Sequence, residues 1–298
     1  MKTRFMSDGD STDALEETFS LVANETRLDI LRTLWDIYTK NPVPDPKPVQ
    51  FSTLKEHVGI RDSGQFHYHL NELVPRFVTS NEEGYTMTYA GGKIVGASFS
   101  GIYTDMNTTL DKQTIEECPQ CGGTRGVRYE QGHAIVDCDG CDRTRTISVP
   151  PILIAAHDVE ESPELLGTFT VTQLQQTIRG FCHLCSGPVE GRVASSSLDD
   201  EVDGDGSVKL AYTCTECGAP SYTPATTAVL DHPAVVSLLH DAGIDYRDVS
   251  SWEIQQALDS EECILQKDPV RVNVTVNTND GERTLVLDEE LNVVDYDS

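Results

Sequence analysis

The chain has 298 residues and carries 22 lysines and arginines against 49 aspartates and glutamates, which gives a net charge of -27. This length is about twice that of a usual domain, so we expect two or more domains. The charge excludes a protein that coats nucleic acid by bulk positive charge. Since no long apolar run occurs, we expect no membrane-spanning helix. No secretory signal opens the chain, so we also expect a cytoplasmic location.

The negative charge is distributed unevenly along the chain. Residues 1–97 carry a net charge of -4, whereas residues 98–298 carry -23, and arginines outnumber lysines by 14 to 8. High acidity with few lysines suits a halophile, because acidic surfaces stay hydrated in a salt-rich cytoplasm. The alternative is an acidic protein of an ordinary cytoplasm that binds basic partners. Composition favours the first interpretation.

Residues 13–97 contain the pattern of a small helical domain with a β-hairpin. Apolar residues at helical spacing predict helices near residues 13–22, 24–38, 52–58 and 62–74, with a tight turn between the last two. Residues 77–80 and 85–89 then read as two strands around a turn at 81–84. Helices with a tight turn between the third and the fourth, followed by a hairpin, are the layout of a winged helix-turn-helix.

The fourth predicted helix is the candidate DNA reader. With Phe66, Leu70 and Leu73 facing inward, its outward face and the residue before it carry polar side chains. Hydroxyls, amides, imidazoles and guanidinium groups can bind phosphates and base edges of double-stranded DNA. The alternative is an ordinary solvated helix face. The candidate DNA-binding residues are Arg61, Ser63, Gln65, His67, Tyr68 and Asn71.

Residues 98–115 are expected to form a linker helix. Ile102, Tyr103, Met106 and Leu110 lie at helical spacing within this segment. The linker would separate the DNA-binding domain from the acidic part of the chain.

Downstream, one cysteine pattern occurs twice. Eight of the nine cysteines form four C-x-x-C pairs. A predicted hairpin separates the first pair from the second, and another separates the third from the fourth. A cytosolic chain of this kind uses such pairs mainly for zinc, because four thiolates satisfy the tetrahedral preference of Zn²⁺. We therefore predict tandem zinc ribbons at 116–150 and 181–225, with two structural Zn²⁺ sites. The ligands are Cys118, Cys121, Cys138 and Cys141 in the first ribbon, and Cys182, Cys185, Cys214 and Cys217 in the second.

Two histidines and the ninth cysteine are not expected to bind metal. His133 and His183 are not needed as ligands, and Cys263 is expected to be a buried small apolar residue.

Thioredoxin-like redox chemistry is the alternative for C-x-x-C, but four pairs with hairpin spacing argue against it. Because a closed Cys₄ site has no open coordination position, and no nucleophile or acid–base pair stands out, we do not expect an enzyme.

Two further segments complete the predicted organisation. Residues 151–180 form a connecting helical segment, with Ser162-Pro163 as a helix-start signal. Residues 226–298 form a C-terminal α/β segment, with short helices at 233–242 and 250–258 and an antiparallel meander at 270–276, 283–287 and 293–296. The fold class is thus α+β, an N-terminal winged helix-turn-helix followed by tandem Cys₄ ribbons with small helical and antiparallel β elements.

Three stretches of the first domain resemble a known family. They are Asn24-Glu-Thr-Arg-Leu-Asp-Ile-Leu-Arg, Gly64-Gln-Phe-His-Tyr-His-Leu-Asn-Glu-Leu and Gly84-Tyr-Thr-Met-Thr-Tyr-Ala-Gly. The match covers roughly residues 14–97 and is similar to the winged-helix domain of ArsR-like transcriptional regulators, and most to haloarchaeal members with C-terminal cysteine pairs. The resemblance implies sequence-specific DNA binding and a homodimer. The third helix here holds no cysteine, so the resemblance does not extend to metal sensing at that helix.

The sequence therefore predicts a DNA-binding transcriptional regulator whose acidic C-terminal module binds an effector or a partner in the transcription machinery. One alternative is a zinc- or redox-responsive sensor in which the ribbons switch DNA binding. Another is a protein-interaction module without specific DNA binding.

Overall fold

The computed structural model describes residues 10–40, 47–105, 107–118, 120–198, 207–245 and 250–297, and its fold class is α+β. The chain divides into two compact units. One comprises residues Met1–Met106 with Pro150–Ile152, and the other comprises Asn107–Val149 with Leu153–Ser298. Within the described ranges, no helix is long and apolar enough to cross a membrane. The two units are described separately below.

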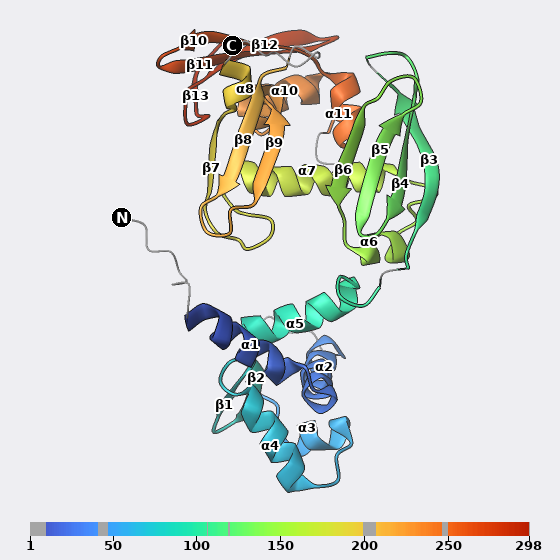
Figure 1. The fold of residues 1–298 in the computed structure, drawn as a ribbon, viewed down its shortest axis with the longest axis vertical. Coiled ribbons are helices and arrows are strands. Elements are labelled where there is room, and N and C mark those ends of the chain that lie inside the picture. The colour runs from blue at the N-terminus through green and yellow to red at the C-terminus, as the bar shows by residue number, and fades with distance from the viewer. Residues whose placement is uncertain are drawn as a thin grey trace. The chain divides into compact units, whose positions relative to one another are not determined.

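The first unit is mainly helical (Figure 1). Its elements are α1 (Asp10–Val22), α2 (Glu25–Lys40), α3 (Phe51–Val58), α4 (Ser63–Leu73), β1 (Val78–Asn81), β2 (Gly84–Met87) and α5 (Tyr89–Ser100). One apolar core joins them, with Ile30 and Leu34 of α2, Leu54 of α3, Leu70 of α4 and Val95 of α5 all buried. These helices are held by packing of their apolar faces, since each is too short to be stable alone.

Two local signals place α4 after α3. Gly59 takes a left-handed conformation (φ 80°) that ends α3, which glycine adopts without strain. Asp62 then caps α4, its Oδ1 accepting hydrogen bonds from the N–H groups of Gly64 at 2.7 Å and Gln65 at 2.9 Å. The tight turn between these helices, expected from the sequence, is therefore present.

The hairpin pairs β1 with β2 in antiparallel register from Val78 opposite Met87 to Asn81 opposite Gly84. Gly84 has φ 141°, and a Cβ there would lie 2.5 Å from the carbonyl oxygen of Val49. This position therefore requires glycine. The predicted second strand at 85–89 was too long, because Thr88 caps α5 by accepting the N–H of Gly91.

The prediction of a linker helix at 98–115 is wrong. Helix α5 ends at Ser100, where Gly101 takes a left-handed conformation (φ 74°). Residues Leu110–Glu117 form strand β3, which pairs with β4. Ile102 and Tyr103 are exposed, so their helical spacing did not reflect a buried face.

The described part of the second unit contains three antiparallel sheets (Figure 1). The first is β3 (Leu110–Glu117), β4 (Thr124–Glu130), β5 (His133–Cys138) and β6 (Thr144–Ser148); the second is β7 (Val189–Val193), β8 (Lys209–Cys214) and β9 (Pro220–Pro224); the third is β10 (Asp259–Lys267), β11 (Val270–Thr278), β12 (Gly281–Leu287) and β13 (Val293–Tyr296). Its helices are α7 (Glu164–Ile178), α8 (Ser195–Leu198), α9 (Ala225–Val229), α10 (Pro233–Asp241) and α11 (Ser251–Ala257), together with α6 (Pro151–Ala156) from Leu153 onward.

Helices α7 and α11 join the two apolar cores of this unit. Leu166 of α7 and Trp252 of α11 are buried in the core under the first sheet. Val171 of α7 and Ile254 of α11 belong to the core shared by the second and third sheets. At Gly167 a Cβ would lie 2.4 Å from the Cβ of Ser250, so glycine permits the close approach of the two helices. The segments predicted separately from the sequence thus belong to one compact body.

Strand β10 was not predicted, and its presence overturns one expectation. Cys263 lies on this strand and is exposed, not buried. Side chains alternate along a strand, and here the partly buried positions are Glu262 and Ile264 on either side of it. Cys263 therefore falls on the outward face.

Candidate metal centres and candidate nucleic-acid interface

The first cysteine group gathers at one end of the β3–β6 sheet. Cys118 and Cys121 lie in the turn from β3 to β4, while Cys138 ends β5 and Cys141 precedes β6. The hairpin register places Arg125 of β4 opposite Cys138, which brings the two turns together. All four sulfur atoms lie within 4.8 Å of one another.

The second group repeats this arrangement on the β7–β9 sheet. Cys182 and Cys185 precede β7, and Cys214 and Cys217 follow from the end of β8. Their four sulfurs also lie within 4.8 Å of one another, with Cys185 and Cys214 at 3.5 Å and Cys182 and Cys217 at 3.7 Å. Each predicted set of four is therefore brought together, and each could hold a metal ion.

Backbone N–H groups point at the sulfurs in both groups. Gly123 and Gly140 donate to Cys121 and Cys138 at 3.4 and 3.3 Å, and Gly187 donates to Cys185 at 3.4 Å. Such hydrogen bonds favour the thiolate, which is the form that binds metal. The backbone of these turns therefore stabilises cysteine sulfurs in the thiolate form.

The tight turns use left-handed residues at matching places. Gly122, Ser186 and Gly218 each follow the first cysteine of a pair by four residues, with φ values of 71°, 61° and 76°. After Cys121 and Cys217 this residue is glycine, which adopts the left-handed conformation without strain. Ser186 takes the same conformation without being glycine, which no sequence signal indicated.

The cysteine pKa values are split within each group. The backbone N–H of Gln120 lowers the pKa of Cys118 to about 7, and that of Cys217 lowers the pKa of Cys214 to about 7. At Cys121 the N–H of Gly123 favours the thiolate, but the neighbouring thiols, Cys138 foremost, raise its pKa to about 12. In the first group Cys118 therefore carries the first negative charge, and Cys121 keeps its proton until a bound cation compensates a second charge.

The structure also places the other candidate ligands. Neither His133 nor His183 belongs to a cluster able to hold a metal ion among the described residues. Four soft thiolates suit Zn²⁺ or another thiophilic metal. Since each set already supplies four donors, the arrangement is suited to holding structure together.

All six candidate DNA-binding residues are exposed. They are Arg61, Ser63, Gln65, His67, Tyr68 and Asn71. On the opposite side of α4, the inward positions Phe66, Leu70 and Leu73 are fully buried. The helix thus presents a continuous polar face to solvent.

Two of these residues have neighbours that the sequence did not indicate. The Nζ of Lys55 on α3 donates to the Oγ of Ser63 at 2.6 Å, which places a cation at the start of α4. The Nδ2 of Asn71 lies 3.3 Å from the ring nitrogens of His67, one helical turn away. Lys55 could have been suspected as a cation beside the turn, but its contact depends on the angle between the helices.

The tip of the β1–β2 hairpin is acidic. Glu82 and Glu83 are exposed there, and the Oδ1 of Asn81 accepts hydrogen bonds from the N–H groups of Glu83 and Gly84. An acidic tip would repel phosphate at close range. It is therefore poorly suited to enter a groove of DNA.

Comparison with known proteins yields two family models. Residues 15–98 match the family described as domain of unknown function DUF7347, and residues 115–293 match the family described as domain of unknown function DUF7351. No curated protein and no solved structure matches the chain significantly. The second match spans more than half of the sequence and includes both cysteine groups. The chain therefore belongs to the DUF7351 family.

Proposed function

We propose that this protein is a sequence-specific DNA-binding regulator of transcription and not an enzyme. In this proposal residues 13–97 form a winged helix-turn-helix that binds double-stranded DNA as a homodimer, as ArsR-like regulators do. The observation that carries the proposal is the exposed polar face of α4, which follows α3 through a tight turn and precedes a β-hairpin.

The chemistry of this face suits base reading. A recognition helix contacts base edges from its exposed N-terminal residues. Gln65 and Asn71 carry amides that can pair with adenine, and His67 and Tyr68 can donate or accept hydrogen bonds. Arg61 and Lys55 lie beside the N-terminus of α4, where cations can bind phosphate. The acidic tip Glu82–Glu83 would stay outside the groove.

Two structural Zn²⁺ ions are part of the proposal. Bound zinc would supply a four-thiolate cross-link that fixes each pair of turns. The residues would be Cys118, Cys121, Cys138 and Cys141 at one site, and Cys182, Cys185, Cys214 and Cys217 at the other. Metal analysis of the chain should give two zinc ions, and Cys185→Ser should reduce this to one. A value that stays at two in the variant would contradict separate Cys₄ sites.

Exposure of some ligands favours a second candidate function. Cys121, Cys185 and Cys217 are solvent-exposed, so oxidants and chelators could reach them. In this case the ribbons would act as a zinc- or redox-responsive switch of DNA binding. Mild chelation would then change DNA affinity while the first unit stays folded, whereas unchanged affinity would exclude the switch.

The DNA-binding proposal can be tested by selecting DNA from a random-sequence pool with the full chain in concentrated KCl. We expect the wild type to enrich one motif. The double variant His67→Ala, Asn71→Ala should lose that enrichment because the base contacts are removed. His133→Ala, which changes an exposed histidine of the second unit, is the matched control and should enrich the same motif.

Two outcomes would contradict the proposal. Failure of the folded wild type to enrich any motif would favour a protein-interaction module. An unchanged motif in the double variant would show that α4 does not read bases.

A further inference from the structure

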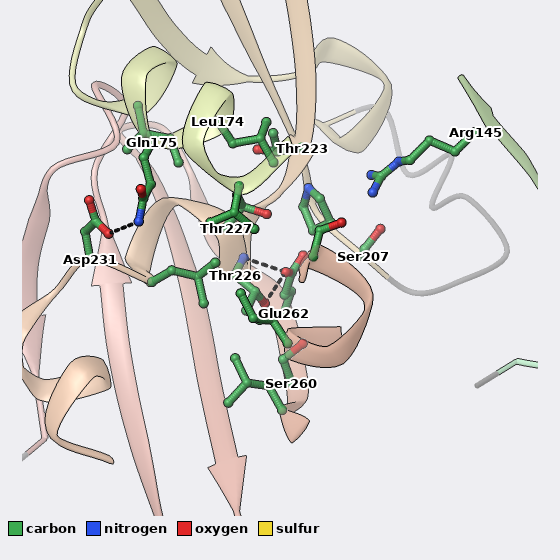
Figure 2. Close-up of a pocket in the computed structure, with 17 residues that line it drawn as sticks. Arg145, Leu174, Gln175, Ser207, Thr223, Thr226, Thr227, Asp231, Ser260 and Glu262 are labelled. Atoms are coloured by element: carbon green, nitrogen blue, oxygen red, sulfur yellow. Dashed lines mark hydrogen bonds between the residues drawn. The ribbon is translucent and has the colours of Figure 1, made fainter. Parts of the chain in front are cut away.

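The second unit contains a cavity of about 220 Å³ that neither the cysteine groups nor α4 explains. Residues from α7, β9, α9, α11 and β10 form its walls, and Arg145 of β6 reaches it from the first sheet (Figure 2). Because these elements belong to one compact body, the cavity is built by tertiary packing. All of its lining residues lie in the described part of the chain.

Much of the wall is apolar. Leu174 and Ile178 come from α7, and Leu230 directly follows α9. Ile254 belongs to α11, and Leu258 directly follows that helix. Aliphatic side chains around a concave space favour an apolar ligand body, since burial removes its surface from water.

The two carboxylates of the wall are already engaged. Glu262 accepts hydrogen bonds from the N–H of Val208 at 2.7 Å and from the N–H and hydroxyl of Thr226 at 2.6 and 2.5 Å. Asp231 accepts from Gln175 at 3.1 Å and pairs with Arg179 at 2.5 Å. Figure 2 shows Glu262 facing Thr226 and Asp231 facing Gln175. These acids hold the walls together and leave little capacity for a cationic ligand.

Arg145 differs from both acids. Among the described residues it has no hydrogen-bond or ion-pair partner, and its side chain is accessible to solvent. Its pKa is lowered because surrounding protein desolvates the guanidinium, and because Arg125 and Arg143 are near. Arg145 thus faces the cavity with Arg125 and Arg143 as the charged groups that act on its pKa, in a chain of net charge -27.

We propose that this cavity binds a small amphipathic carboxylate, with its apolar body against α7 and α11 and its carboxylate on Arg145. A guanidinium binds a carboxylate through two parallel hydrogen bonds. Arg145 is the one cation among the described residues that line the cavity. This favours a monoanion, because Glu262 and Asp231 would repel a more highly charged group such as a phosphate. The volume suits a ligand of about ten non-hydrogen atoms. This binding does not depend on the DNA-binding proposal.

Calorimetric titration of the full, metal-loaded chain with octanoate, 1-octanol and octylamine tests the proposal. We expect saturable binding of one octanoate per chain. 1-Octanol should bind roughly tenfold more weakly because it lacks the charge-assisted pair with Arg145, and octylamine should bind more weakly still. Arg145→Gln should reduce octanoate affinity to that of 1-octanol while leaving 1-octanol unchanged.

Two further variants serve as controls. Arg143→Gln changes an arginine that precedes the same strand but does not line the cavity, and it should bind octanoate like the wild type. Leu174→Trp should fill the cavity and remove binding of both octanoate and 1-octanol, with thermal unfolding used to verify that each variant folds. Equal octanoate affinity in the wild type and Arg145→Gln would overturn the role of Arg145. Octylamine binding as tightly as octanoate, or no saturable octanoate binding to the folded chain, would overturn the proposed ligand class.

Discussion

Ser186 occupies a backbone conformation that serine rarely adopts. Its φ of 61° matches the φ of 71° at Gly122 and 76° at Gly218 in the equivalent cysteine turns. A left-handed conformation places a Cβ near the following carbonyl oxygen, which costs about 1 kcal/mol or more in a residue other than glycine. The turn after Cys182 thus carries a strain that the other two turns avoid.

Replacing this residue should therefore stabilise the protein. We expect Ser186→Gly to raise the free energy of unfolding of the metal-loaded chain by up to about 1 kcal/mol, measured by urea unfolding in concentrated salt. The reciprocal change Gly218→Ser should lower it. A decrease on Ser186→Gly would show that the serine side chain stabilises the turn more than its backbone strains it.

The split cysteine pKa values predict a pH-dependent metal affinity. Cys118 and Cys214 have pKa values lowered to about 7, whereas Cys121 and Cys185 have values raised to about 12. Metal must displace the protons that remain on these thiols, so binding releases protons and weakens as pH falls.

Competition with a chelator of known affinity should show this loss as pH decreases from about 8 to about 6, where Cys118 and Cys214 also become protonated. Cys263→Ser is the matched control and should leave affinity unchanged at every pH, because that exposed thiol lies outside both groups. An affinity independent of pH would contradict binding through thiolates.

Under the DNA-binding proposal, helix α4 stabilises the fold with one face and would contact DNA with the other. Leu70 is fully buried in the core of the first unit, and Asn71 next to it is exposed. We expect Leu70→Ala to lower the free energy of unfolding by about 2–5 kcal/mol, because it removes buried methyl groups and leaves a cavity.

Asn71→Ala should change stability by less than about 0.5 kcal/mol while weakening DNA binding. Chemical unfolding and DNA titration of both variants would verify this division. A large loss of stability in Asn71→Ala with no loss of DNA binding would contradict this division and would show that Asn71 contributes to folding.

The sequence predicts elements best where a local signal defines them. Gly59 ends α3 and Asp62 begins α4 by their own conformation and hydrogen bonds, and the helices predicted at 52–58 and 62–74 stop and start at these residues. Strands β3 and β10 were missed because they are polar edge strands whose order comes from pairing with β4 and β11. Pairing across the chain leaves little trace in a strand's own residues.

The candidate sites follow the same distinction. Spacing alone located all eight clustered cysteines, because C-x-x-C turns and hairpins are local structures. The cavity could not be predicted, since Arg145 and Glu262 meet it from strands 117 residues apart in sequence. Its existence depends on how α7 and α11 pack between the sheets.

At the scale of the whole molecule, charge divides the protein. The first 97 residues carry a net charge of -4, and the remaining residues carry -23. Under the DNA-binding proposal, the low charge of the first part would permit an approach to DNA, although attraction through counterion release contributes little in concentrated salt. Sequence selectivity would then rest on base contacts from α4 and on DNA shape.

The same charge predicts a salt-dependent stability. Repulsion among the acidic side chains opposes folding, and salt screens it. We expect the melting temperature to rise between about 0.1 M and about 2 M KCl. Sodium chloride at equal ionic strength should act similarly if screening is the cause. A melting temperature that falls or stays constant over this range would contradict adaptation of the acidic surface to salt.

Mapping of binding sites across the genome of the native host tests the DNA-binding proposal most directly. It would compare the wild type with the double variant Gln65→Ala, Asn71→Ala. The proposal predicts discrete sites in promoter regions that share one sequence motif and that disappear in the double variant. Absence of discrete sites for the wild type, or the same sites in both proteins, would contradict sequence-specific DNA binding through α4.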